Sequence, residues 1–153
     1  MMKSKTTAAP SIEEFKKILR EKQLKTTPQR VSVHEAMLSL GHASADMVAE
    51  YISKKGGQSV TIASVYNILL SLSDLGIYHH RYSSNNKMYF DVNTFKHFHL
   101  YDAVNHKFQD VIDDELYTLI EEKLLSRRFK GYKISGIDVQ ILARPSLKAR
   151  KQP

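Results

Sequence analysis

The stretch SVTIASVYNILLSLSDLGIYHHRYSSNNKMYFDV, residues 59–92, decides the fold class. Its first half places Ile62, Val65 and Leu69 at helical spacing, and Gly76 supplies a stop for that helix. The segments IYHHRY and KMYFDV then flank the turn SSNN, which predicts a β-hairpin directly after the helix. A helix followed at once by a hairpin is typical of the second half of a winged helix.

Three further helices are predicted upstream of this stretch. Ser11 and Glu14 form a capping-box pattern at the start of the first helix. Thr27 is the expected N-cap of the second helix, which has a proline at its first position, and Ser44 is the expected N-cap of the third. Together these elements predict a helix-turn-helix with a wing, a fold that binds double-stranded DNA.

The second half of the chain predicts a small α+β unit. HFHLYDAV and KFQDVI have the character of strands, as does DVQILA near the end. Between them, DDELYTLIEEKLLSRRF predicts a helix with acids at its start and Arg127 and Arg128 near its end, as the helix dipole favours. The predicted fold class is therefore α+β, a winged helix followed by a small α/β domain.

Composition limits the classes of function. No apolar run approaches the roughly 20 residues of a membrane span, and the start of the chain lacks the apolar block of a secretory signal, so we expect a cytoplasmic protein with no membrane partner. The chain has no cysteine, which excludes disulfides, thiolate zinc sites and thiol redox chemistry. The net charge of +7 fits nucleic-acid binding and equally fits an ordinary basic protein.

The helix before the hairpin carries candidate DNA-reading residues, namely Thr61, Ser64, Tyr66 and Asn67. An asparagine can pair with adenine through two hydrogen bonds, and a tyrosine ring can contact a thymine methyl group. The alternative is a helix that only packs, with Tyr66 at its rim. The candidates for phosphate contacts are Lys16 and Arg30 and, beside them, Lys17, Arg20, Lys25, Arg81 and Lys87.

The motif HFH places His97 and His99 on the same face of a strand, because side chains alternate along it. Asp91 and Asp110 offer carboxylates on either side, whereas Asp102 should face away from His99. Nitrogen and oxygen donors suit Fe²⁺, Mn²⁺ or Zn²⁺ and disfavour copper(I). Two alternatives remain open here: structural histidines, and the His/carboxylate triad of a non-haem iron oxygenase.

The order KTTPQR, GHASAD, TIASVYNIL with LGI, YFD and HFH resembles the ferric uptake regulator family over residues 12–143. The resemblance implies a homodimeric repressor that binds an A·T-rich inverted repeat and carries a regulatory metal between its two domains. The peroxide-sensing branch is similar in having Tyr-Asn in the recognition helix and a regulatory site of three histidines and two aspartates. The positions matching that site are His42, Asp91, His97, His99 and Asp110.

The resemblance also implies a domain plan and a mechanism. The expected boundaries are a disordered N-terminus at 1–10, a winged helix at 11–91, a hinge at 92–96, a dimerisation and metal-binding domain at 97–143 and a flexible basic tail at 144–153. Fe²⁺ or Mn²⁺ would act as the regulatory ion, with Zn²⁺ binding possible in vitro. With iron, peroxide would oxidise His42 or His97 and release the DNA. The alternatives are a metal-uptake regulator that does not oxidise itself, and a constitutive DNA-binding protein whose metal is structural.

The chain departs from the family pattern at the structural zinc site, which most members build from two CxxC pairs. The first pair's positions are Asp102 and Asn105, so no structural zinc is expected. Dimer stability would then depend on apolar packing of the sheet and of helix residues such as Leu116, Leu119, Ile120 and Leu124. The histidines outside the predicted site are expected to be surface or packing residues: His34, His79, His80 and His106.

Overall fold

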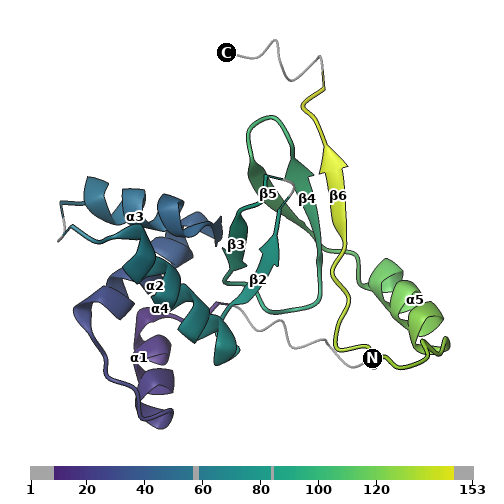
Figure 1. The fold of residues 1–153 in the computed structure, drawn as a ribbon, viewed down its shortest axis with the longest axis horizontal. Helices are drawn as coiled ribbons and strands as arrows, with labels where there is room; N and C mark the ends of the chain where they lie inside the picture. Colours follow the sequence, from purple (N-terminus) through teal and green to yellow (C-terminus); the bar gives the residue numbers. More distant parts are fainter. Residues whose placement is uncertain (1–8, 57–58, 84, 147–153) are drawn as a thin grey trace. The chain divides into compact units, whose positions relative to one another are not determined.

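The computed structural model describes residues 9–56, 59–83 and 85–146, and it divides the chain into two compact units, Met1–Phe95 and Lys96–Pro153 (Figure 1). Helices and strands occur in both units, which confirms the predicted α+β class. Most of the segments predicted to be disordered lie outside the described residues, namely 1–8 and 147–153.

The first unit is a winged helix, as predicted. Its elements are α1 (Ile12–Glu21), α2 (Pro28–Leu40), β1 (His42–Ala43), α3 (Ala45–Lys54), α4 (Ile62–Asp74), β2 (His79–Tyr82) and β3 (Met88–Asp91). The hairpin strands β2 and β3 pair antiparallel, and β1 adds to the other side of β3 to give the order β1-β3-β2. The sequence did not predict β1, because two residues are too short for a periodic signal.

Local hydrogen bonds explain where these helices begin. Both halves of the predicted capping box are present, since the Ser11 side chain accepts from the Glu14 N–H and the Glu14 carboxylate accepts from the Ser11 N–H. Thr27 and Thr61 cap α2 and α4 in the same way. Ser44 occupies the N-cap position of α3, but its side chain makes no capping hydrogen bond, so that part of the prediction was wrong.

The wing sheet has one face in the core and one face turned away from it. Phe90 and Ala43 are opposed in the register, are fully buried, and belong to the core formed with the helices. The ring of Phe90 lies edge-on to Tyr66 of α4. Because side chains alternate along a strand, the neighbouring opposed pair, His42 and Asp91, lies on the other face of the sheet.

The second unit is a three-stranded sheet with one helix. Its elements are β4 (Phe98–Asp102), β5 (Lys107–Val111), α5 (Asp114–Leu125) and β6 (Gln140–Ala143), with β4 in the centre, antiparallel to β5 and parallel to β6. Asp113 caps α5 through a hydrogen bond from the Leu116 N–H. The helix ends at Leu125 with Ser126 as its C-cap, and Arg127 and Arg128 follow directly, near the end of the helix as predicted.

Hydrogen bonds close the turn between β4 and β5. The Asp102 carboxylate accepts from the backbone N–H groups of Val104 and Asn105, at 2.8 and 3.0 Å, and from the Asn105 side-chain amide at 2.8 Å. These bonds, those from Asn105 first, lower the pKa of Asp102. Asp102 and Asn105 are the positions of the first CxxC pair in the family pattern, and here the turn is closed without a metal.

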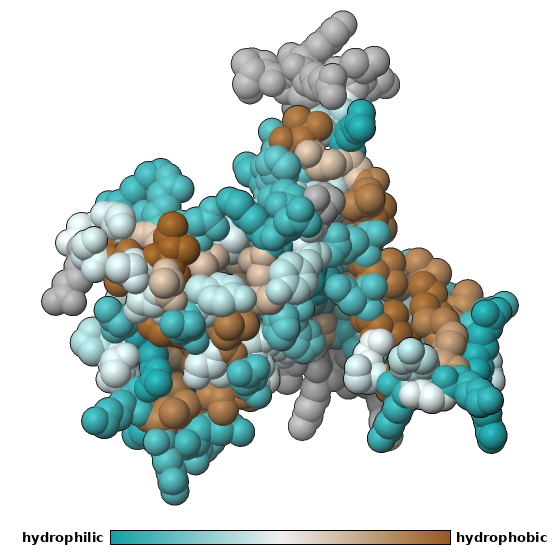
Figure 2. Space-filling view, viewed as in Figure 1, coloured by the Kyte–Doolittle hydropathy of each residue, from teal (hydrophilic) through white to brown (hydrophobic). Residues whose placement is uncertain are grey.

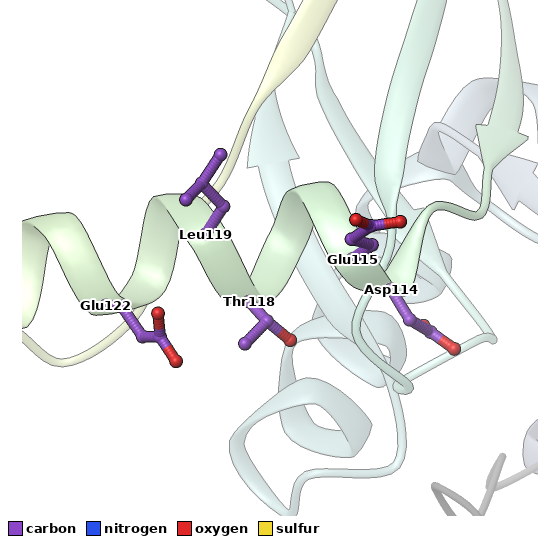
Figure 3. Close-up of a pocket in the computed structure, with 5 residues that line it drawn as sticks. All are labelled: Asp114, Glu115, Thr118, Leu119 and Glu122. Carbon is purple, nitrogen blue, oxygen red and sulfur yellow. The ribbon is translucent and has the colours of Figure 1, made fainter.

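The second unit leaves much of its apolar surface uncovered. None of the residues of α5 is buried, and Leu116, Leu119 and Leu125 on this helix are exposed, as are Ile141 and Leu142 of β6. Figure 2 shows apolar surface gathered over α5. Figure 3 shows Leu119 pointing away from the opposite, polar side of the helix, where Thr118 and Glu122 lie.

The four histidines outside the predicted metal site have packing or surface positions, as expected. His79, His80 and His106 are exposed. His34 is fully buried, and its ring stacks on Phe15 with a centroid distance of 4.1 Å. Its Nε2 lies 2.7 Å from the Pro10 carbonyl oxygen and its Nδ1 lies 2.6 Å from the Tyr78 hydroxyl.

The hydrogen bonds of His34 define its protonation state. A carbonyl oxygen only accepts, so Nε2 carries the proton and Nδ1 accepts from the Tyr78 hydroxyl. Burial lowers the pKa of His34, while the hydrogen bond to Pro10 and the charge of Glu35 oppose that shift. The ring is therefore neutral in the folded unit.

No helix within the described ranges is both long and apolar enough to cross a membrane.

His34 makes a testable contribution to the pH dependence of stability. An unfolded histidine takes up a proton near pH 6.5, and the folded chain resists that proton, so stability is lost as the pH falls below about 6.5. We expect His34→Gln to lower the free energy of unfolding by about 2 kcal/mol near neutral pH, since it loses a buried, doubly hydrogen-bonded ring. The variant should lose less further stability than the wild type between about pH 7 and pH 5.5.

Urea unfolding in the presence of a chelator, followed by circular dichroism at both pH values, measures this effect. His80→Gln, at an exposed position in the same unit, is the matched control. A pH dependence that is the same in His34→Gln and in the wild type would contradict the assignment.

Candidate metal centre and nucleic-acid interface

The first unit contributes a histidine and an aspartate to a candidate metal centre. His42 and Asp91 are paired across β1 and β3, and the His42 Nδ1 lies 3.6 Å from the Asp91 Oδ2. The other oxygen of Asp91 accepts a hydrogen bond of 2.8 Å from the Asn93 N–H, which fixes the orientation of the carboxylate. Asp91 is buried and His42 is mostly so. This pair occupies the face of the wing sheet that is turned away from the helical core.

The second unit contributes two histidines and an aspartate. His99 of β4 is opposed to Asp110 of β5, and His97 lies two residues earlier on the same side of the strand. The two rings are neighbours, with centroids 4.4 Å apart, so the predicted common orientation is confirmed. The Nε2 atoms of both rings face one oxygen, Asp110 Oδ1, at 3.2 Å from His97 and 3.8 Å from His99.

These donors have the chemistry and spacing of a metal half-site. Imidazole nitrogens and carboxylate oxygens bind zinc at about 2.0–2.2 Å in tetrahedral sites, so two donors on one ion lie about 3.4 Å apart. The separations between Asp110 Oδ1 and the two imidazoles are close to this value. Both rings are buried, which limits competition from water. The same donor types serve iron(II) and manganese(II).

Asp102, the competing carboxylate, does not join this group. Asp102 lies three residues after His99 on β4, so the two residues are on opposite faces of the strand, and its oxygens accept hydrogen bonds within the β4–β5 turn. A carboxylate that sequence reasoning missed is Asp138, whose Oδ1 lies 3.9 Å from the Nδ1 of His99. No local motif marks Asp138, because its proximity arises from the parallel pairing of β6 with β4.

The candidate DNA-reading residues occupy the N-terminal half of α4. Asn67 and Thr61 are exposed, and the Thr61 hydroxyl also caps the helix. Ser64 and Tyr66 are half-buried. The Tyr66 hydroxyl donates to the sulfur of Met88 on β3 at 3.9 Å, so this ring also ties the helix to the wing. Asn67 is therefore the side chain most available to a base.

The candidate phosphate contacts divide into accessible and engaged side chains. Lys16 on α1 is half-buried, and the Arg30 guanidinium donates to the Lys25 carbonyl at 2.6 Å. Arg81 of β2 is buried. Lys87 forms an ion pair of 2.6 Å with Asp46. The burial of Arg81 does not favour its prediction as a phosphate contact.

Comparisons with known proteins agree on one family. The model of the ferric uptake regulator family matches residues 21–141. The peroxide-responsive repressor PerR of Staphylococcus epidermidis is 26% identical over 131 residues, which cover 85% of each chain.

Solved structures show the same fold. The ferric uptake regulator of Vibrio cholerae has a TM-score of 0.71 at 19% identity, covering 86% of this chain and 99% of its own. The peroxide stress regulator of Campylobacter jejuni has a TM-score of 0.62 at 24% identity, covering 86% of this chain and 96% of its own. The family match extends through both units described above, and the chain therefore belongs to the ferric uptake regulator family.

Proposed function

We propose that this protein is a metal-switched repressor that senses peroxide through oxidation of a ligand histidine. Members of the ferric uptake regulator family are metal-dependent DNA-binding transcription regulators and not enzymes, so the oxygenase interpretation is wrong for this chain. The finer assignment rests on the site residues. The observation that supports a regulatory metal site is that two buried imidazoles direct Nε2 at the same oxygen of Asp110. The similarity to the peroxide-responsive repressor PerR favours the peroxide-sensing branch.

The regulatory ion would be held by residues from both units, namely His42, Asp91, His97, His99 and Asp110. Each unit by itself offers an incomplete donor set, one histidine and one aspartate in the first and two histidines and one aspartate in the second. Iron(II) and manganese(II) accept such mixed nitrogen and oxygen donors. No cysteine is available for a thiolate zinc site.

Ligands on both sides of the hinge at 92–96 make the site a switch. The donors of the first unit reach the ion only when the hinge holds the two units close, so the ion stabilises that arrangement over open ones. At an ion concentration near 100 times the dissociation constant, this linkage supplies about 2.7 kcal/mol. That free energy corresponds to about a hundredfold change in affinity for DNA if the closed arrangement alone binds the operator.

The closed form would act as a homodimer on DNA. The exposed apolar side chains of α5 and β6 supply a surface that a second copy could cover, with Leu116 and Leu119 among them. A twofold dimer places two copies of α4 in successive major grooves of an inverted repeat. Tyr66 and Asn67 favour A·T-rich operators, since asparagine pairs with adenine. We infer a cytoplasmic location, where such an operator lies.

Sensing would depend on the ligand histidines. Iron(II), held by these residues, would supply the chemistry that activates hydrogen peroxide. In the net reaction the two electrons that reduce the peroxide come from the imidazole of His42 or His97: a ring C–H bond becomes a C–O bond, the O–O bond breaks, and the second peroxide oxygen leaves as water. The oxidised ring is a poorer donor. Loss of one donor weakens the clamp across the hinge, so the closed arrangement and the DNA complex are both destabilised. The rival function is a metal-uptake regulator with the same site and no self-oxidation.

The DNA-reading role of α4 is tested by Asn67→Ala. Because Asn67 is exposed and makes contacts that depend on the base, the variant should bind its operator more weakly by about 1–3 kcal/mol, with non-specific binding unchanged. Arg30→Ala, at a candidate phosphate contact, should weaken both operator binding and non-specific binding, and it should reduce the salt dependence of DNA affinity. Fluorescence anisotropy with specific and scrambled duplexes separates the two effects. Equal losses on both duplexes for Asn67→Ala would remove its role as a base reader.

The metal switch is tested by anisotropy of a labelled A·T-rich inverted repeat, with Mn²⁺ and then with chelator, at fixed salt. Manganese fills the site without the oxidative chemistry of iron. We expect DNA to bind at least about tenfold more tightly with Mn²⁺. Asp91→Ala should remain folded, as measured by circular dichroism, and lose only the increase in DNA affinity that Mn²⁺ produces. A parallel loss of folding and DNA binding would instead support a constitutive regulator with a structural metal.

The peroxide claim is tested by intact-mass and peptide analysis after anaerobic loading with Fe²⁺ and exposure to hydrogen peroxide. We expect the mass of one oxygen atom to be added to the peptide that contains His42 or His97. Mn²⁺-loaded protein, treated in the same way, is the control and should stay unmodified. Iron-loaded protein that releases no DNA and gains no oxygen would leave the metal-uptake regulator as the better assignment.

A further inference from the structure

We propose that Asp138 is a positioning residue for the metal centre, which holds His99 through its outer nitrogen; this inference rests on the proposed function of the site. His99 presents Nε2 to Asp110 at 3.8 Å and Nδ1 to Asp138 at 3.9 Å, so its ring lies between two carboxylates. Only one of these nitrogens can face an ion that His97 also faces. Nε2 is that nitrogen, because the His97 Nε2 is directed at the same Asp110 oxygen.

The backbone holds Asp138 beside His99. The His99 N–H donates to the Val139 carbonyl at 3.1 Å, and His99 is paired with Gln140 at the start of β6. On the other side of Asp138, the Ile137 carbonyl accepts a hydrogen bond of 3.3 Å from the Tyr117 hydroxyl of α5. The residues on both sides of Asp138 are thus fixed to the sheet and to the helix, although its own side chain is half exposed.

Metal binding determines which nitrogen of the His99 ring carries the proton and donates a hydrogen bond. In a neutral imidazole without a metal, the proton can reside on either nitrogen. An ion at Nε2 confines the proton to Nδ1, which becomes an obligatory donor directed at Asp138. The distance of 3.9 Å between His99 Nδ1 and Asp138 Oδ1 is longer than a hydrogen bond. We expect the two atoms to come within hydrogen-bonding distance when the ion fixes the proton on Nδ1. A carboxylate acceptor then fixes the ring and increases its basicity.

The contact between His99 and Asp138 also links the metal centre to the segment between α5 and β6. Asp138 lies two residues before the strand β6, which with α5 carries the exposed apolar residues of the second unit. A hydrogen bond from His99 therefore connects the occupied metal centre to the segment that joins α5 and β6. Movement of that segment changes the position of the acceptor, and by reciprocity metal binding at His99 restrains the segment.

The test is Mn²⁺ affinity of the full-length protein, measured by calorimetry for the wild type, Asp138→Ala and Asp138→Asn. Removal of a carboxylate that orients a ligand typically weakens metal binding by about 10- to 100-fold. We expect a loss in this range for Asp138→Ala and a smaller loss for Asp138→Asn, which retains an acceptor oxygen. Glu122→Ala, an acid of similar exposure on the polar side of α5, is the matched control and should bind Mn²⁺ as the wild type does.

A second measurement separates positioning from a general loss of structure. In protein loaded with diamagnetic Zn²⁺, the Nδ1–H of His99 should give an imidazole proton signal that exchanges slowly with water. This signal should be lost in Asp138→Ala while the backbone spectrum is retained, and kept in Asp138→Asn. An unchanged signal together with unchanged Mn²⁺ affinity would overturn the role of Asp138.

Asp110→Ala distinguishes this failure from that of the proposed function. If Asp110→Ala abolishes Mn²⁺ binding and Asp138→Ala does not alter it, the metal site stands and only the positioning role is overturned. If Asp110→Ala binds Mn²⁺ as the wild type does, the site itself is wrong, and the role of Asp138 is overturned with it.

Discussion

The pairing of β4 with β5 is the constraint on which the candidate metal half-site of the second unit depends. Its register sets His99 opposite Asp110 and brings His97 to the same face. A shift of one residue would turn the Asp110 carboxylate to the other face of the sheet and leave both imidazoles without it. The register is secured at one end by the Asp102 turn, whose carboxylate accepts three hydrogen bonds. Ligand geometry is therefore determined by backbone pairing more than by the side chains themselves.

The sequence predicted those features that arise from local chemistry. The caps at Ser11 and Thr27, the helix before the wing and the common orientation of His97 and His99 all depend on residues within one or two turns or on strand alternation. Features that arise from pairing between distant segments were missed. The strand β1, the burial of Arg81 and the proximity of Asp138 to His99 each require knowledge of which strands are neighbours.

The grouping of all five candidate ligands came from the family resemblance and not from spacing. Spacing alone supported His97 and His99 and suggested the carboxylates, whereas His42 is the first residue of an unpredicted two-residue strand and carried no signal of its own. The register of β1 with β3 supplies a physical reason for its inclusion, since it opposes His42 to Asp91. The same face of the wing therefore gathers a nitrogen and an oxygen donor from segments almost fifty residues apart.

The hydrogen-bonded turn at Asp102 and Asn105 affects whether folding of the second unit depends on a supply of zinc. A turn closed by a carboxylate and an amide needs no ion before it can form its hydrogen bonds. Folding of this turn is independent of the supply of zinc in the cell, and chelators or zinc starvation do not deprive it of a structural component. If the protein is switched by one regulatory ion, as proposed, its response to that ion does not depend on a second metal at this turn.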